Sequence, residues 1–190
     1  MQNIEIRRPR SEDSIELNQF FSTVIKDTFA KEGLSEMHDF IENEIENKKQ
    51  YLKCDLDSNG ENRYFLIAID KNSHKIIGTI ACGPASELII SCTGRALKEL
   101  YEVGTIFIHP DYQKRGIGTL LINELFLTFQ NRDIKEFCLD SGYKNAQKVW
   151  MKKFGKPDYL LKDYWGEGRD HMIWKKSTHD MAINLRNDNR

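Results

Sequence analysis

Apolar and polar positions follow two different rhythms along this chain of 190 residues. Alternating or β-branched apolar runs predict strands, whereas apolar residues that recur every three or four positions predict helices. On the first pattern we predict strands over 3–8, 63–70, 75–83, 102–109 and 135–141, and a closing hairpin within 158–176. On the second we predict helices over 11–29, 35–51 and 144–153, and one that begins at or just before Gly118.

Two stretches interrupt this pattern. Residues 54–62, CDLDSNGEN, are polar and are predicted to form a turn. Residues 84–97 fit a short strand or a loop, and both interpretations stay open. The order of the predicted elements indicates an α/β (α+β) protein with a mixed sheet and helices on its faces. No linker separates two cores, so we predict one domain over 1–176, followed by a polar tail over 177–190.

Composition narrows the range of functions. Hydrophobic residues make up 39% of the chain and charged residues 30%, which is typical of a globular protein. The net charge of −1 supplies no basic field for a nucleic acid. No apolar run approaches the roughly 20 residues of a membrane span, and the N-terminus lacks a signal-peptide core. We therefore expect a cytoplasmic protein with neither a nucleic-acid partner nor a membrane partner.

The four cysteines are scattered along the chain, at positions 54, 82, 92 and 138. They form no C-x-x-C pair and show no metal-ligand spacing with the five histidines. We therefore expect reduced thiols and no metal site.

The strongest functional signal lies in residues 102–126, EVGTIFIHPDYQKRGIGTLLINELF. A predicted strand leads through a Pro-Asp turn and QKRGIG into a helix with one apolar face, formed by Ile117, Leu121, Leu125 and Phe129. A helix start exposes unpaired backbone N–H groups and carries about half a positive charge. The glycines let an anion approach the backbone, and Lys114 and Arg115 add positive charge. Together these features are the parts of a diphosphate site.

The same loop residues are compatible with other kinds of structure. A tight turn with surface charges around it fits about as well. The Rossmann fingerprint requires a third glycine, but Leu121 stands at that position. A Walker A loop requires Gly-Lys-Ser/Thr, which does not follow here. A phosphate-binding protein of another class, with a nucleotide at 113–119, also stays open.

Residues Gln113 to Gly118, QKRGIG, resemble the Gln/Arg-x-x-Gly-x-Gly/Ala signature of the GNAT superfamily of acetyl-CoA-dependent N-acetyltransferases. The strand that ends in His-Pro, the aliphatic helix after the signature and the downstream strand–helix unit are similar to the wider family pattern. The resemblance extends over about 4–175, nearly the whole chain. It implies a GNAT-like fold, a mixed, mostly antiparallel twisted sheet with helices on both faces, and acetyl-CoA as cosubstrate.

The resemblance also implies roles for individual residues. In the family, the strand before the signature bulges and pairs its backbone with the pantetheine arm, which here involves Ile106, Phe107 and Ile108. The loop amides face the diphosphate, and the corresponding residues are Gln113, Lys114, Arg115, Gly116, Gly118 and Thr119. Asn145 is a candidate contact of the pantetheine, although an ordinary polar residue at a helix start fits equally well.

Acetylation of an amine requires a base for the attacking group and a proton for the departing thiolate. Glu102 lies eleven residues before Gln113. This offset is similar to that of the general-base glutamate in the histone-acetylating branch of the family, so Glu102 is the first candidate base. Glu99 is the second candidate. A solvent-exposed carboxylate at a strand end would produce the same pattern.

One position departs from the family pattern. Many members carry a tyrosine as general acid in the helix after the fifth strand, but Trp150 stands in its place. An indole cannot deliver a proton at neutral pH, so Trp150 is predicted to shape the acetyl pocket or to be a core residue. Tyr143, Tyr164 or water remains as the proton donor. Aromatic and acidic residues of the closing hairpin suggest a lid over a cationic amine, although a plain aromatic hairpin fits somewhat better.

Two functions of different classes follow from the resemblance. The first is an enzyme that moves an acetyl group from acetyl-CoA to a primary amine by direct attack in a ternary complex. The second is a sensor or regulatory module of the same fold that holds acyl-CoA without turnover. The acceptor amine is not identified by the sequence. A homodimer through the outer strands is an expectation that rests on the resemblance alone.

Overall fold

The computed structural model describes residues 3–181. The chain folds into two compact units. The first unit contains the described residues up to Cys82 together with Thr105–Leu125, and the second contains Gly83–Gly104 together with the described residues from Phe126 onward. The prediction of a single domain over 1–176 stays a prediction, and most of the predicted tail lies outside the described residues.

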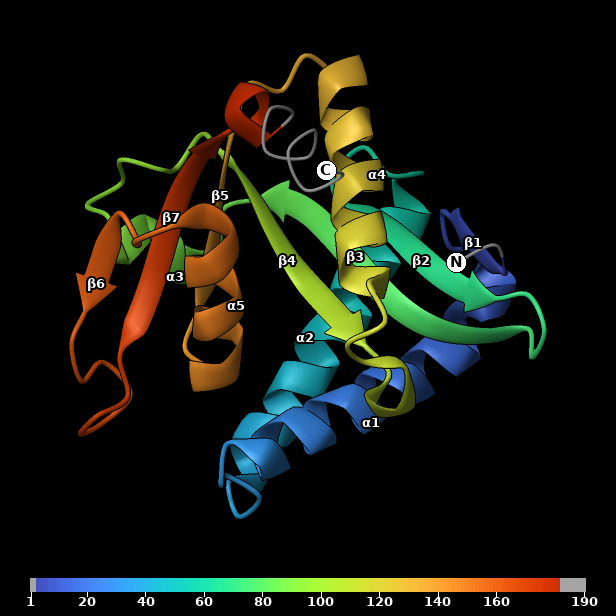
Figure 1. Ribbon diagram of the computed structural model, residues 1–190, viewed down its shortest axis with the longest axis horizontal. Coiled ribbons are helices and arrows are strands. Elements are labelled where there is room, and N and C mark those ends of the chain that lie inside the picture. Colours follow the sequence, from blue (N-terminus) through green and yellow to red (C-terminus); the bar gives the residue numbers. More distant parts are fainter. Residues whose placement is uncertain (1–2, 182–190) are drawn as a thin grey trace. The chain divides into compact units, whose positions relative to one another are not determined.

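The first unit begins with a strand, a helical turn and two long helices, namely β1 (Ile4–Arg7), η1 (Ser11–Asp13), α1 (Ser14–Lys31) and α2 (His38–Asp57). The strands β2 (Tyr64–Asp70) and β3 (Lys75–Pro84) follow. β2 pairs antiparallel with β1 on one side and with β3 on the other. The helices α1 and α2 lie side by side (Figure 1). The apolar face predicted for α1 is confirmed, because Leu17, Phe20, Phe21 and Val24 are all buried.

The segment with the functional signal forms β4 (Tyr101–Ile108), the short helical turn η2 (Pro110–Tyr112) and α4 (Ile117–Asn131). The helix begins one residue before Gly118, as predicted. All four residues of its predicted apolar face, Ile117, Leu121, Leu125 and Phe129, are buried. β3, β4 and α4 each contribute residues to both units.

The second unit also contains α3 (Glu87–Cys92), β5 (Glu136–Ser141), α5 (Lys144–Phe154), β6 (Tyr159–Leu161) and β7 (His171–Ser177). β4 and β5 run parallel where Tyr101 pairs with Phe137 and Glu102 with Cys138. β7 pairs antiparallel with β5 on one side and with β6 on the other, so the predicted closing hairpin is confirmed.

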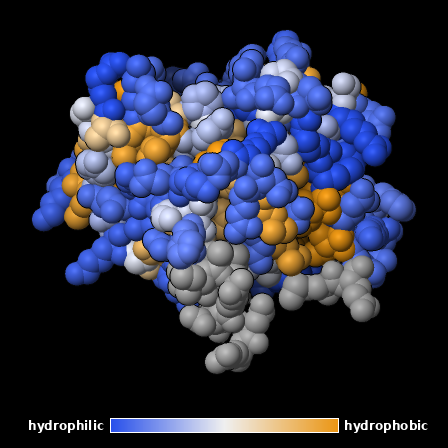
Figure 2. Space-filling view, turned by 90° about the horizontal axis from the view of Figure 1, so that it is seen from above, coloured by the Kyte–Doolittle hydropathy of each residue, from blue (hydrophilic) through white to orange (hydrophobic). Residues whose placement is uncertain are grey.

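The seven strands form one sheet in the order β1-β2-β3-β4-β5-β7-β6. The parallel pair of β4 and β5 stands among antiparallel pairs, which confirms the predicted α/β class with a mixed, mostly antiparallel sheet. Hydrophilic side chains dominate the surface in Figure 2, with apolar groups exposed between them. Among the described residues, no helix is long and apolar enough to cross a membrane.

Two local predictions are wrong. Residues 84–97 contain the helix α3 instead of a strand or a plain loop, because the Ser86 side chain caps the helix by accepting a hydrogen bond from the Ile89 N–H. The polar turn predicted over 54–62 begins four residues later, since α2 continues to Asp57. Asp55 is fully buried in this last turn of α2, where its carboxylate pairs with Arg8 and accepts the Phe65 N–H. The extended part of the helix thus contains a buried ion pair.

Candidate functional site

The loop between β4 and α4 presents a row of backbone N–H groups. The Gly116 carbonyl accepts the Leu120 N–H at 3.1 Å, so Gly116 caps the helix. The N–H groups of the first helical residues, 117–119, therefore have no acceptor within the helix. In the part of the chain that the structure describes, the backbone N–H groups of residues 114–116 also donate no hydrogen bond. Six consecutive N–H groups are thus available to an anion.

The glycines of this region have different roles. Gly116 has a φ of +80°, in the left-handed region, and a Cβ added there would meet no described atom within 4 Å. A Cβ at Gly118 would touch only Ile108, at 4.0 Å. By contrast, a Cβ at Gly78 in β3 would lie 3.0 Å from Leu121 and 3.2 Å from Ile117. Gly78 therefore lets the start of α4 pack closely on β3, whereas the surroundings of Gly116 and Gly118 leave open space beside the backbone.

Side chains around the loop hold it in place. The guanidinium of Arg115 lies over the ring of Tyr112, 5.1 Å from the centroid. The Tyr112 hydroxyl donates to Asp70 at 2.9 Å. Hydrogen bonds from the Asn72 N–H and from Tyr112 lower the pKa of Asp70, so this anchor is charged at neutral pH. The Gln113 N–H bonds to the Pro110 carbonyl at 3.4 Å, so Gln113 uses its backbone within the turn.

The strand before the loop contains one residue with an unusual backbone conformation. Thr105 has a φ of 51°, which is an outlier for a β-branched residue, and its carbonyl accepts the Thr79 hydroxyl at 2.8 Å. After Thr105, the Phe107 ring packs edge-on against Phe21 of α1, with 6.3 Å between centroids. The Ile108 side chain lies beside Gly78 and Gly118. These two side chains are engaged in packing, so a ligand would meet this strand through its backbone.

In the second unit, Glu102 is held by the start of α3. Its Oε2 atom accepts the Ser86 N–H at 2.6 Å. Ser86 also caps α3, so the helix fixes the donor that holds the carboxylate. Its other oxygen lies 3.6 Å from the position that a Cβ on Gly104 would take. The Ser86 N–H thus fixes the orientation of the Glu102 carboxylate.

The residue paired with Glu102 on β5 is Cys138, whose thiol is fully buried. Burial, together with the negative charges of Glu102 and Asp140, raises the pKa of Cys138 to about 12. The thiolate is the nucleophilic form of cysteine, so Cys138 is inert at neutral pH.

Asp140 belongs to a hydrogen-bonded group with His171 and Trp165. His171 is 3% exposed, and its Nε2 atom lies 3.0 Å from the Asp140 carboxylate. The Trp165 indole N–H donates to the His171 Nδ1 atom at 3.1 Å. Since Nδ1 accepts, Nε2 carries the proton, and the Nε2–H group donates a hydrogen bond to the Asp140 carboxylate. A Cβ on Gly142 would lie 2.6 Å from the Trp165 indole nitrogen, so only glycine admits this arrangement.

The remaining predicted site residues lie in different surroundings within this unit. Tyr143 stands at the N-cap of α5, and Asn145 is exposed in the first turn. Tyr164 is 44% exposed. Its pKa is raised, chiefly by a hydrogen bond with Cys92 and to a smaller extent by burial.

Trp150 is 8% exposed and stacks on Phe154, which packs on Phe137. Phe137 and Cys138 are adjacent in β5 and face opposite sides of the sheet, so Trp150 packs on the face opposite to the Cys138 thiol.

The sequence interpretation identified the loop and Glu102 but missed three groups around them. Ser86 carried a signal that was available, namely a helix-capping serine followed by an acidic residue. Trp165 and His171 belong to the hairpin that the sequence singled out as a possible lid, but their hydrogen bonds with Asp140 had no such signal, since they depend on the register of β5 and β7. Lys31 also had none, although its ammonium donates to the Gln113 side chain at 3.0 Å.

Comparisons with known proteins agree with this description. The model of the Acetyltransferase (GNAT) family matches residues 28–155. The fold is similar to that of the PaiA N-acetyltransferase from Thermoplasma acidophilum, solved in complex with coenzyme A, with a TM-score of 0.64, 21% identity, and coverage of 92% of this chain and 98% of that one. No curated protein matches the chain.

Two further solved structures have the same fold. An N-acetyltransferase from Staphylococcus aureus Mu50 gives a TM-score of 0.64 at 14% identity, covering 93% of this chain and 99% of its own. The ribosomal-protein-S5-alanine acetyltransferase from Vibrio fischeri gives 0.63 at 18% identity, covering 95% and 96%.

Proposed function

Because this chain belongs to the GNAT family of acetyltransferases, we propose that it moves the acetyl group of acetyl-CoA to a primary amine by direct attack in a ternary complex. The observation that carries the proposal is the row of six backbone N–H groups at 114–119, at the start of α4. Their number and the positive end of the helix suit a diphosphate, a group that acetyl-CoA carries and a simple thioester lacks.

Acetyl-CoA supplies a thioester carbonyl as the acetyl donor. On the protein side, the N–H groups of 114–119 hold the diphosphate, with Lys114 and Arg115 adding charge. The backbone of Ile106, Phe107 and Ile108 would lie along the pantetheine arm, because the left-handed conformation of Thr105 departs from the regular strand just before them. Asn145, exposed at the start of α5, is a further candidate contact. Trp150 acts on the site indirectly, because it belongs to the core packing that supports α5.

Glu102 is the proposed general base. An amine attacks only in its neutral form, so a carboxylate must accept a proton from the ammonium, directly or through water. The Ser86 N–H orients Glu102 and keeps one of its oxygens in place. Glu99 is a weaker candidate, because its side chain is 88% exposed and is paired with Lys98.

Direct attack is favoured over a covalent route through Cys138. Its pKa of about 12 leaves the thiol protonated, and its burial bars a bulky thioester. The departing thiolate of coenzyme A needs a proton from another group. Tyr164, which is 44% exposed, is one candidate donor. Tyr143 and water are the alternatives.

The decisive experiment measures binding and turnover separately. Calorimetric titration with acetyl-CoA is followed by a thiol-release assay over a panel of primary amines. Binding with turnover supports the proposal. Tight binding without turnover on any amine would favour a sensor of the same fold, and a clear preference for ATP over acetyl-CoA would overturn both.

The variant Glu102→Gln tests the base. Glutamine still accepts the Ser86 N–H but cannot take up a proton, so kcat should fall by at least about a hundredfold. The affinity for acetyl-CoA, measured by calorimetry, should stay within about twofold of the wild type. Glu99→Gln is the matched control and should keep its activity. Unchanged turnover of Glu102→Gln at every pH would remove Glu102 from the mechanism.

A further inference from the structure

The end of α1 is linked to the diphosphate loop by one side chain. Lys31, the last residue of α1, donates from Nζ to the Gln113 Oε1 atom at 3.0 Å. Gln113 in turn donates from Nε2 to the carbonyl of Ile108, the last residue of β4, at 3.3 Å. A chain of hydrogen bonds therefore joins the helix end, the first residue of the signature and the end of the strand, all within the first unit.

The ammonium of Lys31 is held from its own helix. Asp27, one turn earlier, accepts from Nζ at 2.6 Å. The helix stops at once after Lys31, because Gly33 adopts a φ of +73° and the Leu34 N–H returns to the Phe29 carbonyl at 2.8 Å. Both features restrain the position from which Lys31 reaches the loop.

The two neighbours of Gln113 also determine which way its amide points. An ammonium only donates hydrogen bonds and a backbone carbonyl only accepts them. The Gln113 oxygen must therefore face Lys31 while its nitrogen faces Ile108. A neutral residue at position 31 would remove the charge-assisted bond, and the Ile108 carbonyl alone would then hold the Gln113 amide.

We propose that Lys31 is a positioning residue of the coenzyme A site. It fixes the amide of Gln113 and, through Gln113, the point at which the chain leaves β4 and enters the loop of N–H groups. This inference rests on the proposed use of the loop for a diphosphate. Lys31 lies outside the signature, 82 residues before Gln113, so the signature itself does not reveal the link.

The variant Lys31→Met tests the link with two measurements. Calorimetric titration with coenzyme A should show an affinity about fivefold lower, and Lys31→Arg should restore most of it. In the absence of ligand, hydrogen exchange of the hydrogen-bonded amides of His109, Tyr112, Gln113 and Leu120 should become faster, because the loop has lost an anchor. Lys26→Met is the matched control: it removes one exposed positive charge from the same helix and should change neither measurement.

A double-mutant cycle with Gln113→Ala separates positioning from direct contact. If Lys31 acts through Gln113, the double variant should bind coenzyme A no more weakly than Gln113→Ala alone. Additive losses would overturn positioning in favour of a direct contact of Lys31 with the ligand. Unchanged affinity and exchange in Lys31→Met would overturn the inference entirely. If the wild type itself binds no coenzyme A, the proposed function fails, while the exchange measurement still decides whether Lys31 anchors the loop.

Discussion

Gly116 and Gly118 look equivalent in the signature, but only Gly116 has a backbone conformation that favours glycine. Gly116 has a φ of +80°, so any side chain there strains the backbone whatever space surrounds it. Gly118 lies within α4 without a positive φ, and a Cβ would make only an ordinary contact with Ile108 at 4.0 Å. A loss of coenzyme A binding in a Gly116 variant would therefore be ambiguous, whereas a loss in a Gly118 variant reports a clash with the ligand.

Substitution of Gly118 should separate folding from binding. Gly118→Ala should leave the free energy of unfolding unchanged or raise it by up to about 1 kcal/mol, because alanine is the better helix former. Gly118→Val places two methyl groups beside the N–H groups and should weaken coenzyme A binding at least about tenfold, or about 1.4 kcal/mol. Calorimetry gives the affinities and thermal unfolding gives the stabilities. Full affinity in a folded Gly118→Val protein would mean that the loop is only a turn.

The sequence could reveal the loop because all of its parts lie within seven consecutive residues. The partners that hold the site residues are distant in sequence: Ser86 lies 16 residues before Glu102, and Lys31 lies 82 before Gln113. Helix and strand rhythms indicate which residues are buried, but not which polar side chains meet after the elements pack. Trp150 illustrates this limit, since the sequence left its role open between pocket and core, and only the packing on Phe154 shows its surroundings.

At the scale of elements, the short helix α3 and the last turn of α2 escaped prediction, whereas the longer helices did not. α3 has six residues with two adjacent isoleucines, which favour a strand, and its helical form depends on the cap at Ser86. The last turn of α2 looked like a polar turn, yet Asp55 is buried there beside Arg8. In both places a specific polar contact overrides the local preference, and such contacts leave little trace in the hydrophobic pattern.

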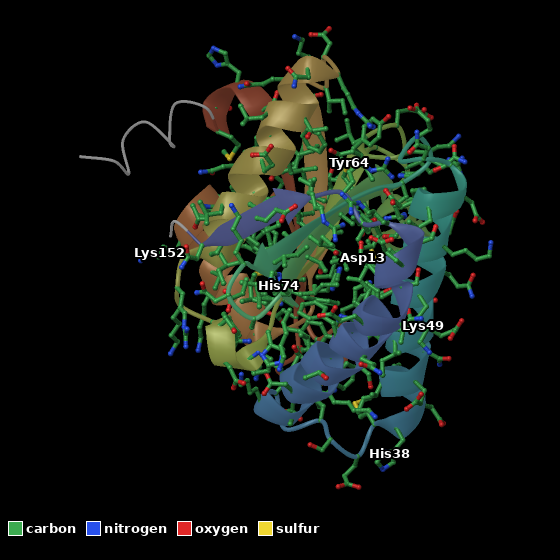
Figure 3. The ribbon with its side chains drawn as sticks, turned by 90° about the vertical axis from the view of Figure 1, so that its right-hand side faces the viewer. Asp13, His38, Lys49, Tyr64, His74 and Lys152 are labelled. Carbon is green, nitrogen blue, oxygen red and sulfur yellow. The ribbon has the colours of Figure 1, made fainter. Side chains whose placement is uncertain are left out.

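The junction between β1 and α1 depends on another contact of this kind. Asp13 lies where α1 begins (Figure 3). Its two carboxylate oxygens accept from the Arg7 guanidinium at 2.7 and 2.9 Å, and the Arg10 N–H donates to it at 2.7 Å. The hydrogen bonds from Arg7 lower the pKa of Asp13 below its ordinary value of 3.8. The charged carboxylate therefore stabilises the folded state, and this contribution depends on pH.

Asp13→Asn should destabilise the protein by about 1–3 kcal/mol at pH 7, because a charge-assisted double hydrogen bond is lost. Since the folded-state pKa lies below the unfolded one, the contribution is complete well above pH 3.8 and disappears as the pH falls below that value. The difference between wild type and variant, measured by urea unfolding, should therefore shrink from about pH 5 downward. Glu12→Gln, at a carboxylate that is 72% exposed, is the control and should change stability little. A difference that stays constant down to pH 3 would contradict the role of the charge.

At the scale of the whole molecule, three continuous elements belong to both compact units. β3, β4 and α4 each cross from one unit to the other without a break. If one unit unfolds, the other therefore loses part of the same strands and of the same helix. The prediction of a single domain therefore has a direct test, which is whether the two units unfold together.

The chain provides a separate signal for each unit, because all three tryptophans, Trp150, Trp165 and Trp174, lie in the second unit, whereas the 18-residue α1 and the 20-residue α2 lie in the first. Tryptophan fluorescence therefore reports on the second unit, and far-ultraviolet circular dichroism reports largely on the first. We expect both to give one midpoint in urea, since the shared elements couple the units. Coenzyme A at a hundred times its dissociation constant should raise the free energy of unfolding by about 2.7 kcal/mol. Both urea midpoints should therefore shift upward together. Two separate midpoints would mean that the units unfold independently and that the chain is not one cooperative domain.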